Sequence, residues 1–193
     1  NQTLGSIYGV SKSGEVAMND EAHMGILLRS PVLANPTNRT HPILRGVFTL
    51  RRILCNEVPG PSPKDLADRN GAPFVPDPFH DSTAIMTAKQ TSAQSCMKCH
   101  YAINPIGFAF EGYDNVGRSR TIDKIFDSEG RFIANHDVKI NSYTNIGLKS
   151  VQVTSGLQLI NEIANSDVGP ACMTRHMFRF YQFRREAYTD ACA

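Results

Sequence analysis

Apolar residues recur at three- and four-residue steps in several segments of the chain, and this spacing places them on one face of a helix. The pattern is clearest from Ile43 to Cys55, where arginines occupy the opposite face. Ser82 is a suitable N-cap for a later segment, and Pro170 suits the first turn of the last one. The predicted helices are residues 43–55, 83–93, 157–165 and 170–185.

Segments rich in proline or glycine interrupt these helices and predict extended chain. Residues 1–22 are polar and rich in glycine and serine, so we expect an irregular N-terminal arm. Residues 59–80 hold six prolines and two glycines, and we expect a connector that wraps the surface or covers a bound group. Pro105 is expected to end the helical turn before it, with one more short helix at 106–113.

Short β-prone runs between residues 118 and 140 predict one β-hairpin. The segments 119–122 and 131–133 flank the turn-forming sequence Asp127–Gly130. The acidic residues there lack the alternate spacing of a calcium loop, so we interpret them as a solvated turn. We predict a mainly α fold in which residues 23–193 form a single helical domain with a small hairpin and long proline- and glycine-rich arms.

Composition narrows the classes of function. Of the 193 residues, 41% are hydrophobic, which is enough for the core of one domain. The formal net charge of +2 is too balanced to indicate a nucleic acid or an anionic membrane as the partner. No apolar run is long enough to predict a membrane-spanning helix. The N-terminal residues do not resemble a signal peptide, so we interpret the chain as a processed product.

Residues 96–100 read Cys-Met-Lys-Cys-His, and this motif carries the most specific chemistry in the chain. C-x-x-C-H is the attachment signature of a c-type haem, in which both thiols bond to the haem and the histidine is the proximal iron ligand. A thioredoxin-like pair or half of a zinc site is the alternative, but neither a βαβ setting nor a second ligand pair is present. We therefore predict one covalent haem c, held by Cys96, Cys99 and His100.

The cysteines also indicate the cellular compartment in which the protein is found. Covalent haem attachment of this type takes place outside the bacterial cytoplasm, so we expect a periplasmic or extracellular protein in which disulfides persist. Cys172 and Cys192 bracket one C-terminal segment, and a bond between them would close a loop of about 20 residues, worth roughly 3 kcal/mol. Cys55 would then be unpaired, although either of its own pairings is also possible.

Several motifs together resemble one family. The chain resembles the C-terminal haem module of the large exported planctomycete-type cytochrome c proteins, which also occur in proteobacteria. The likeness covers roughly residues 24–190 and implies a monohaem, cytochrome c-like helical domain that acts as a redox module. Departures include Asn104 where the family usually has aspartate, Gln90 where it often has histidine, and Phe183 in place of a glycine. The motifs are Arg45-Gly46-Val47-Phe48, Leu54-Cys55, the proline-rich run, residues 96–100, Asn104-Pro105-Ile106-Gly107-Phe108, and the Glu111, Tyr113, Asp114, Gly117, Arg118 and Arg120 series.

The second axial position of the iron has several candidates. Met24 lies in an apolar run, and Met177 follows His100 by about 77 residues, a separation similar to that in small class I cytochromes. A histidine ligand or a position without a protein ligand is also possible. Methionine raises the reduction potential, a second histidine lowers it, and an open position admits peroxide or diatomic ligands. The histidine candidates are His23, His41, His136 and His176.

Two further residues are candidates for haem contact. Arg45 begins a segment that looks buried, and a buried arginine needs a counter-charge. One candidate for that charge is a haem propionate, which Arg118 or Arg120 could bind equally well. The other is an acidic side chain at Asp114 or Glu111. Phe108 is expected to pack on the porphyrin or in the core, where it would exclude water.

These features predict electron transfer as the function, with a redox protein or a larger complex as the partner. The first alternative is a peroxidase-like enzyme with an open distal site. Such an enzyme needs an acid–base pair at the distal site. His136, Glu111 and Arg118 could supply it, although no recognisable motif joins them. The second alternative is a haem that serves only as a structural staple.

Overall fold

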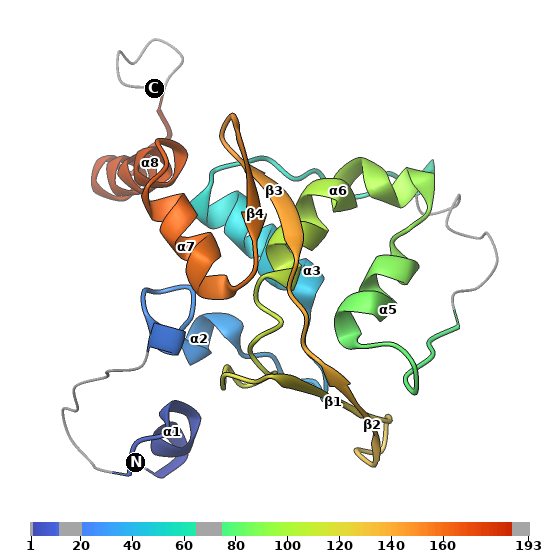
Figure 1. Cartoon of the computed structure of the whole chain (residues 1–193). Helices are drawn as coiled ribbons and strands as arrows, with labels where there is room; N and C mark the ends of the chain where they lie inside the picture. Colours follow the sequence, from blue (N-terminus) through green and yellow to red (C-terminus); the bar gives the residue numbers. More distant parts are fainter. Residues whose placement is uncertain (1, 12–20, 65–74, 187–193) are drawn as a thin grey trace.

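The computed structural model describes residues 2–11, 21–64 and 75–186, in which helices combine with two small antiparallel sheets (Figure 1). The helices are α1 (Gln2–Tyr8), η1 (Glu21–His23), α2 (Ser30–Leu33), α3 (Pro42–Phe48), η2 (Thr49–Ile53), α5 (Thr83–Gln90), α6 (Gln94–Phe108), α7 (Gly156–Ala164) and α8 (Val168–Gln182). The strands are β1 (Ile122–Phe126), β2 (Phe132–Asp137), β3 (Ser142–Ile146) and β4 (Lys149–Val153). Among these residues no helix combines the length and apolar character needed to cross a membrane.

Helices α3 and α6 cross at the centre of the molecule, and two glycines allow their backbones to touch (Figure 1). A Cβ on Gly46 would lie 2.4 Å from the carbonyl oxygen of Ile103, and one on Gly107 would lie 2.1 Å from that of Pro42. The second half of α6 continues into the core, where Ile106 and Phe110 are almost fully buried. The close contacts at the two glycines therefore fix the direction in which the N-terminal half of α6 extends from the core.

The two sheets are separate antiparallel hairpins. The first, β1–β2, confirms the predicted hairpin, and its turn is closed by Asp127, whose Oδ1 accepts from the backbone N–H of Glu129 and of Arg131. These donors stabilise the carboxylate and lower the pKa of Asp127. The second hairpin, β3–β4, was not predicted; Gly147, at φ +62°, begins its two-residue turn.

The helical predictions are confirmed at all four places. The segment from Ile43 becomes α3 and then a π-helical turn, η2. Ser82 caps α5, because its Oγ accepts from the backbone N–H of Ile85 at 3.4 Å. The last two helices match α7 and α8 within two or three residues. The expected irregular arm is wrong over residues 2–8, which form α1.

The expectation that Pro105 breaks the helix is wrong, because α6 runs through it to Phe108. Proline deletes one backbone hydrogen bond, here the one to the carbonyl of Tyr101. Tyr101 is 64% exposed, so water can serve that carbonyl, while the residues after Pro105 gain the core packing that compensates. The expected separate helix at 106–113 is absent, since residues 109–112 form turns.

The disulfide joins Cys55 to Cys172, and the expected Cys172–Cys192 bond is therefore wrong. Cys55 follows η2, and Cys172 is the buried residue of α8 that faces it. Proximity in space decides the pairing, and with a sequence separation of 117 it could not be predicted from the sequence. Cys192 lies outside the described residues.

Candidate functional site

The Cys-Met-Lys-Cys-His motif lies in the N-terminal half of α6. A helix places residues i, i+3 and i+4 on one face, so Cys96, Cys99 and His100 all line the same cavity. Both cysteines are free thiols and partly exposed, in contrast to the disulfide-bonded pair. The spacing of the motif thus presents two thiols and one imidazole to a single space.

That space is a cavity of about 650 Å³, and we call it the motif cavity. Helix α3 and the turn after it contribute Ile43, Val47 and Arg51, and the proline-rich connector contributes residues 58–62 as a further wall. The lining is mostly apolar, and the volume falls within the range of small-molecule and cofactor sites. The remaining lining residues are Gln90, Thr91, Ser95, Lys98 and Ile103.

A chain of hydrogen bonds, part-buried at His100 and buried beyond it, holds the imidazole of His100. Its Nδ1 lies 2.9 Å from Oδ1 of Asn104, one helical turn later. The amide nitrogen of Asn104 donates to Oγ1 of Thr91 at 2.7 Å, and the Thr91 hydroxyl donates to the carbonyl of Thr87 at 2.8 Å. Asn104 and Thr91 are both buried. The Nε2 atom of His100 has no hydrogen-bond partner within the described part of the chain.

The position of Thr91 depends on a second polar network at the other end of α5. Asp123 of β1 accepts from the backbone N–H of Thr83, the first residue of α5, at 2.7 Å. Asp123 also pairs with Arg120 at 2.6 Å. Hairpin β1–β2 therefore holds the N-terminal end of α5, and the other end of this helix places Thr91 beside Asn104.

These residues fit a haem c. The group needs two thiols, one neutral imidazole nitrogen and apolar walls, and the motif cavity provides all of them. Cys96, Cys99 and His100 would hold it, while the apolar side chains of Ile43, Val47 and Ile103 would pack against it. Its bound iron would supply one-electron redox chemistry.

Arg51 is the cationic side chain that α3 and η2 bring to this cavity. Its guanidinium donates to the carbonyl of Val58, which joins η2 to the connector. Arg51 also lines a neighbouring cavity of about 470 Å³, together with three arginines from the C-terminal segment. Within this arginine-lined cavity, the described residues are Arg51, Cys55, Asn56, Glu57, Val58, Pro59, Arg175, Arg179 and Arg185.

Arg45 does not line the motif cavity, and the acidic alternative for its counter-charge is confirmed. Its Nη1 lies 3.6 Å from Oε1 of Glu111, with both side chains 5% exposed. Burial lowers the pKa of Arg45 to about 10 and raises the pKa of Glu111 despite its cationic neighbours. The guanidinium also donates to the carbonyls of Leu33, Phe110, Tyr113 and Asp114. Arg45 thus clamps the backbone around α2 and the turns after α6.

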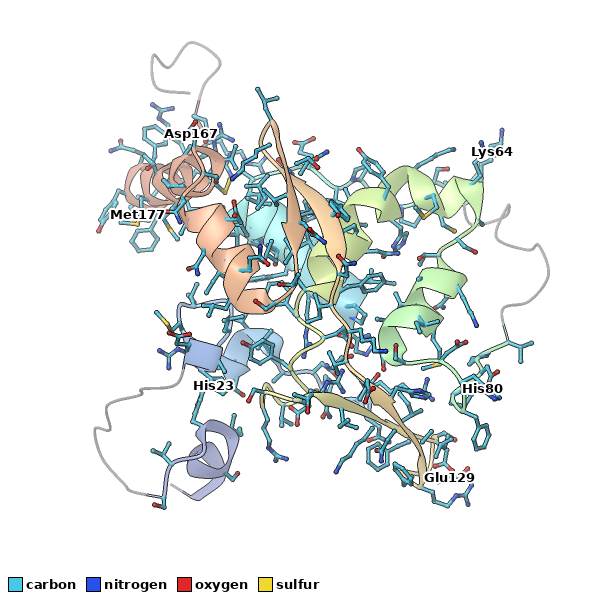
Figure 2. All side chains as sticks on the ribbon, viewed as in Figure 1. His23, Lys64, His80, Glu129, Asp167 and Met177 are labelled. Atoms are coloured by element: carbon cyan, nitrogen blue, oxygen red, sulfur yellow. A yellow bond between two sulfur atoms is a disulfide. The ribbon has the colours of Figure 1, made fainter. Side chains whose placement is uncertain are left out.

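Phe108 and the two methionine candidates also lie outside the motif cavity. Phe108 borders a small pocket with Glu111 and Arg120. Met24 and Met177 are about half exposed. Met177 lies on α8, at the left of the view, away from the N-terminal half of α6 at the right (Figure 2). Met173 and Tyr181, on the same helix as Met177, are exposed as well.

Three of the four histidine candidates are engaged elsewhere. His23, His136 and His176 each bond through Nε2 to a backbone carbonyl, at 3.0, 2.9 and 2.9 Å. His41 is the N-cap residue of α3 and does not line the motif cavity. Within the described chain, the lining of that cavity holds no methionine and no histidine besides His100.

Sequence reasoning missed Asn104, Thr91 and Arg51 as site residues. Asn104 could have been found from its position four residues after His100, on the same face of a helix. That spacing was not used, because Pro105 was expected to end the helix. Arg51 was placed on the polar face of its helix, and the path of the connector brings it to the motif cavity. Thr91 could be found only from the packing of α5 on α6.

Comparison with known proteins identifies a family. No curated protein and no solved structure is significantly similar to the chain. A family model described as PSCyt3, protein of unknown function (DUF1588), matches residues 23–123. The match covers just over half of the chain and includes α3, the connector and the Cys-Met-Lys-Cys-His motif. The chain therefore belongs to the PSCyt3 family.

Proposed function

We propose that the chain binds one haem c, attached through thioethers to Cys96 and Cys99 and ligated by His100, and that it transfers electrons. The observation that carries the proposal is the convergence of both thiols and the imidazole on the motif cavity. The family name, PSCyt3, is in keeping with a cytochrome.

Electron transfer requires little from the protein beyond holding and tuning the cofactor. The apolar lining lowers the local dielectric constant around the iron. The hydrogen bond between His100 and the amide oxygen of Asn104 orients the imidazole. We further propose a periplasmic or extracellular location and a redox protein as the partner, within a larger assembly. Arg51 and the arginine-lined cavity beside it would give the partner-facing surface a positive character.

The experiment expresses the chain for export, together with a haem-attachment system, and measures its intact mass after denaturation. The expected mass is that of the polypeptide plus one haem, with the pigment retained in acidified organic solvent. A Cys96→Ala, Cys99→Ala double variant should lose the added mass. Met97→Leu, which changes a partly exposed residue between the two thiols, should keep it. A wild-type mass equal to the bare polypeptide would refute haem attachment.

A second candidate function is binding of a small exogenous ligand at the iron. It is favoured by one observation: apart from the two cysteines, which the proposed thioethers would occupy, the described lining offers no methionine and no second histidine as an iron ligand. The oxidised protein would then be high-spin, and cyanide would convert it to a low-spin spectrum. A low-spin spectrum unaffected by cyanide would support the electron carrier and direct the search for the second ligand to Met24, Met177 and the segments outside the described residues.

A further inference from the structure

The hydrogen bonds around His100 determine which of its ring nitrogens carries the proton. The Thr91 hydroxyl lies 2.8 Å from the carbonyl of Thr87, and a carbonyl can only accept. The hydroxyl proton therefore points to Thr87, and Oγ1 is left to accept from the atom of Asn104 that lies 2.7 Å away. That atom must be the amide nitrogen, so the amide oxygen of Asn104 faces His100.

The same reasoning extends to the imidazole. The oxygen of Asn104 lies 2.9 Å from Nδ1 of His100 and can only accept, so Nδ1 must carry the proton. In a neutral imidazole the other nitrogen, Nε2, then holds the lone pair that binds a metal. Asn104 is 7% exposed and Thr91 is 5% exposed, so water competes poorly for the bonds from Asn104 to Thr91 and from Thr91 to Thr87 that fix the orientation of the amide.

We infer that Asn104, oriented by Thr91, is a positioning residue that holds His100 in the Nδ1–H tautomer and sets the reduction potential of the haem. This inference rests on the proposed function. A hydrogen bond at Nδ1 makes the imidazole a stronger electron donor, which stabilises the oxidised iron. A stronger acceptor at position 104 should lower the potential, and the loss of the acceptor should raise it.

The first experiment measures the potential of the haem-loaded chain and of its position-104 variants by spectroelectrochemistry. Asn104→Asp replaces a neutral acceptor with a carboxylate and should lower the potential. Asn104→Leu removes the acceptor and should raise it. We expect each change to alter the ratio of reduced to oxidised protein about tenfold at a fixed solution potential, which is 59 mV for one electron. Equal potentials in all three proteins would overturn the inference.

A matched pair on α5 isolates the role of Thr91. Thr91→Val removes the hydroxyl that orients the amide of Asn104 and should shift the potential in the same direction as Asn104→Leu. Thr87→Val makes the same substitution one turn earlier, where the hydroxyl bonds the carbonyl of Thr83 and does not touch Asn104. It should leave the potential unchanged. Equal shifts in both variants would indicate a general effect on α5 and would overturn the role of Thr91.

The inference and the proposed function can fail separately. Intact mass reports haem attachment, and the potential is compared only among variants that carry haem. In the full chain without haem, nitrogen NMR of His100 at a pH where imidazole is neutral should show protonated Nδ1 in the wild type. Asn104→Leu should show a mixture of the two tautomers. A mixture in the wild type would overturn the inference even if haem attachment is confirmed.

Discussion

Arg45 illustrates at the scale of one residue why a buried cation is retained in this fold. Its guanidinium donates to backbone carbonyls of α2 and of the turns after α6, which meet at the core, and Glu111 balances its charge. A lysine has three donors on one nitrogen and cannot span these acceptors. The side chain therefore acts as a structural clamp, and its position away from the motif cavity follows from that role.

Arg45→Met should destabilise the chain by about 3–5 kcal/mol, because it leaves the Glu111 carboxylate and several carbonyls buried without partners. Urea unfolding followed by circular dichroism measures the loss. Arg52→Met changes an exposed arginine of the following turn and should cost less than about 0.5 kcal/mol. If the two variants are equally stable, the clamp does not contribute as described.

Glu186 gives a dependence on pH at the end of α8. A hydrogen bond from Arg179 lowers its pKa from the ordinary 4.5 to about 2, and Arg175 adds to the attraction. The folded state therefore binds this proton less tightly than the unfolded state, so the stabilisation is complete above pH 4.5 and is lost as the pH falls through about 2.

The carboxyl carbon of Glu186 should titrate near pH 2 by NMR, and Arg179→Gln should move its midpoint upward. Added salt should act in the same direction, because this pair is exposed and screened. A wild-type midpoint at the ordinary 4.5 would contradict the pairing.

At the scale of elements, the crossing of α3 and α6 depends on the absence of two side chains. Gly107→Ala would place a Cβ against the backbone of Pro42 and should cost about 1–3 kcal/mol, together with a lower yield of haem attachment as the motif cavity changes shape. Thermal unfolding and intact mass measure the two effects. Gly112→Ala meets only the side chain of Ile140 at 3.6 Å and should be neutral. If Gly107→Ala and Gly112→Ala have equal effects on stability, then α3 and α6 can move apart at their crossing without loss.

The disulfide ties η2 to α8, a helix whose other residues are mostly exposed. Because it closes a loop of 117 residues, its removal should cost up to about 5 kcal/mol in the chain-entropy model. Cys55→Ser with Cys172→Ser should lower the melting temperature and speed hydrogen exchange across α8. Mild reduction of the wild type should give the same result, and it should leave the proposed haem attached because thioethers are not disulfides. Unchanged exchange in α8 would mean that its other contacts suffice.

Local sequence signals predicted the elements whose causes are local. The cap at Ser82 and the turn at Asp127 depend on neighbours a few residues away, and both were found. The second hairpin had a signal in its alternating strands around Gly147, and that signal was overlooked. The Cys55–Cys172 bond depends on the docking of α8, which sequence spacing does not encode. Haem attachment stays a prediction, but the two thiols and the imidazole of the motif do share one face, because they lie within one turn and a half of a single helix.

At the scale of the molecule, burial divides α6 into two parts. From Ile103 onward most of its residues are buried against α3 and the core, whereas every residue from Gln94 to Ala102 is exposed or only partly buried. The N-terminal half carries the motif and faces the motif cavity. The fold thus buries the C-terminal end of the helix and leaves the end that carries the motif exposed or only partly buried.

Haem attachment should therefore order the N-terminal half of α6 and the connector, and leave the glycine crossing unchanged. Hydrogen exchange of the haem-loaded wild type, compared with Cys96→Ala, Cys99→Ala, should be at least about tenfold slower in residues 97–102 and 58–62, which is about 1.4 kcal/mol of added local stability. Amides from Ile103 to Phe108 and in α3 should exchange at similar rates in both, because the core already protects them. If the haem is instead a structural staple, protection should be lost throughout the molecule in the variant. The distribution of exchange along α6 thus separates a cofactor held by a preformed core from one on which the whole fold depends.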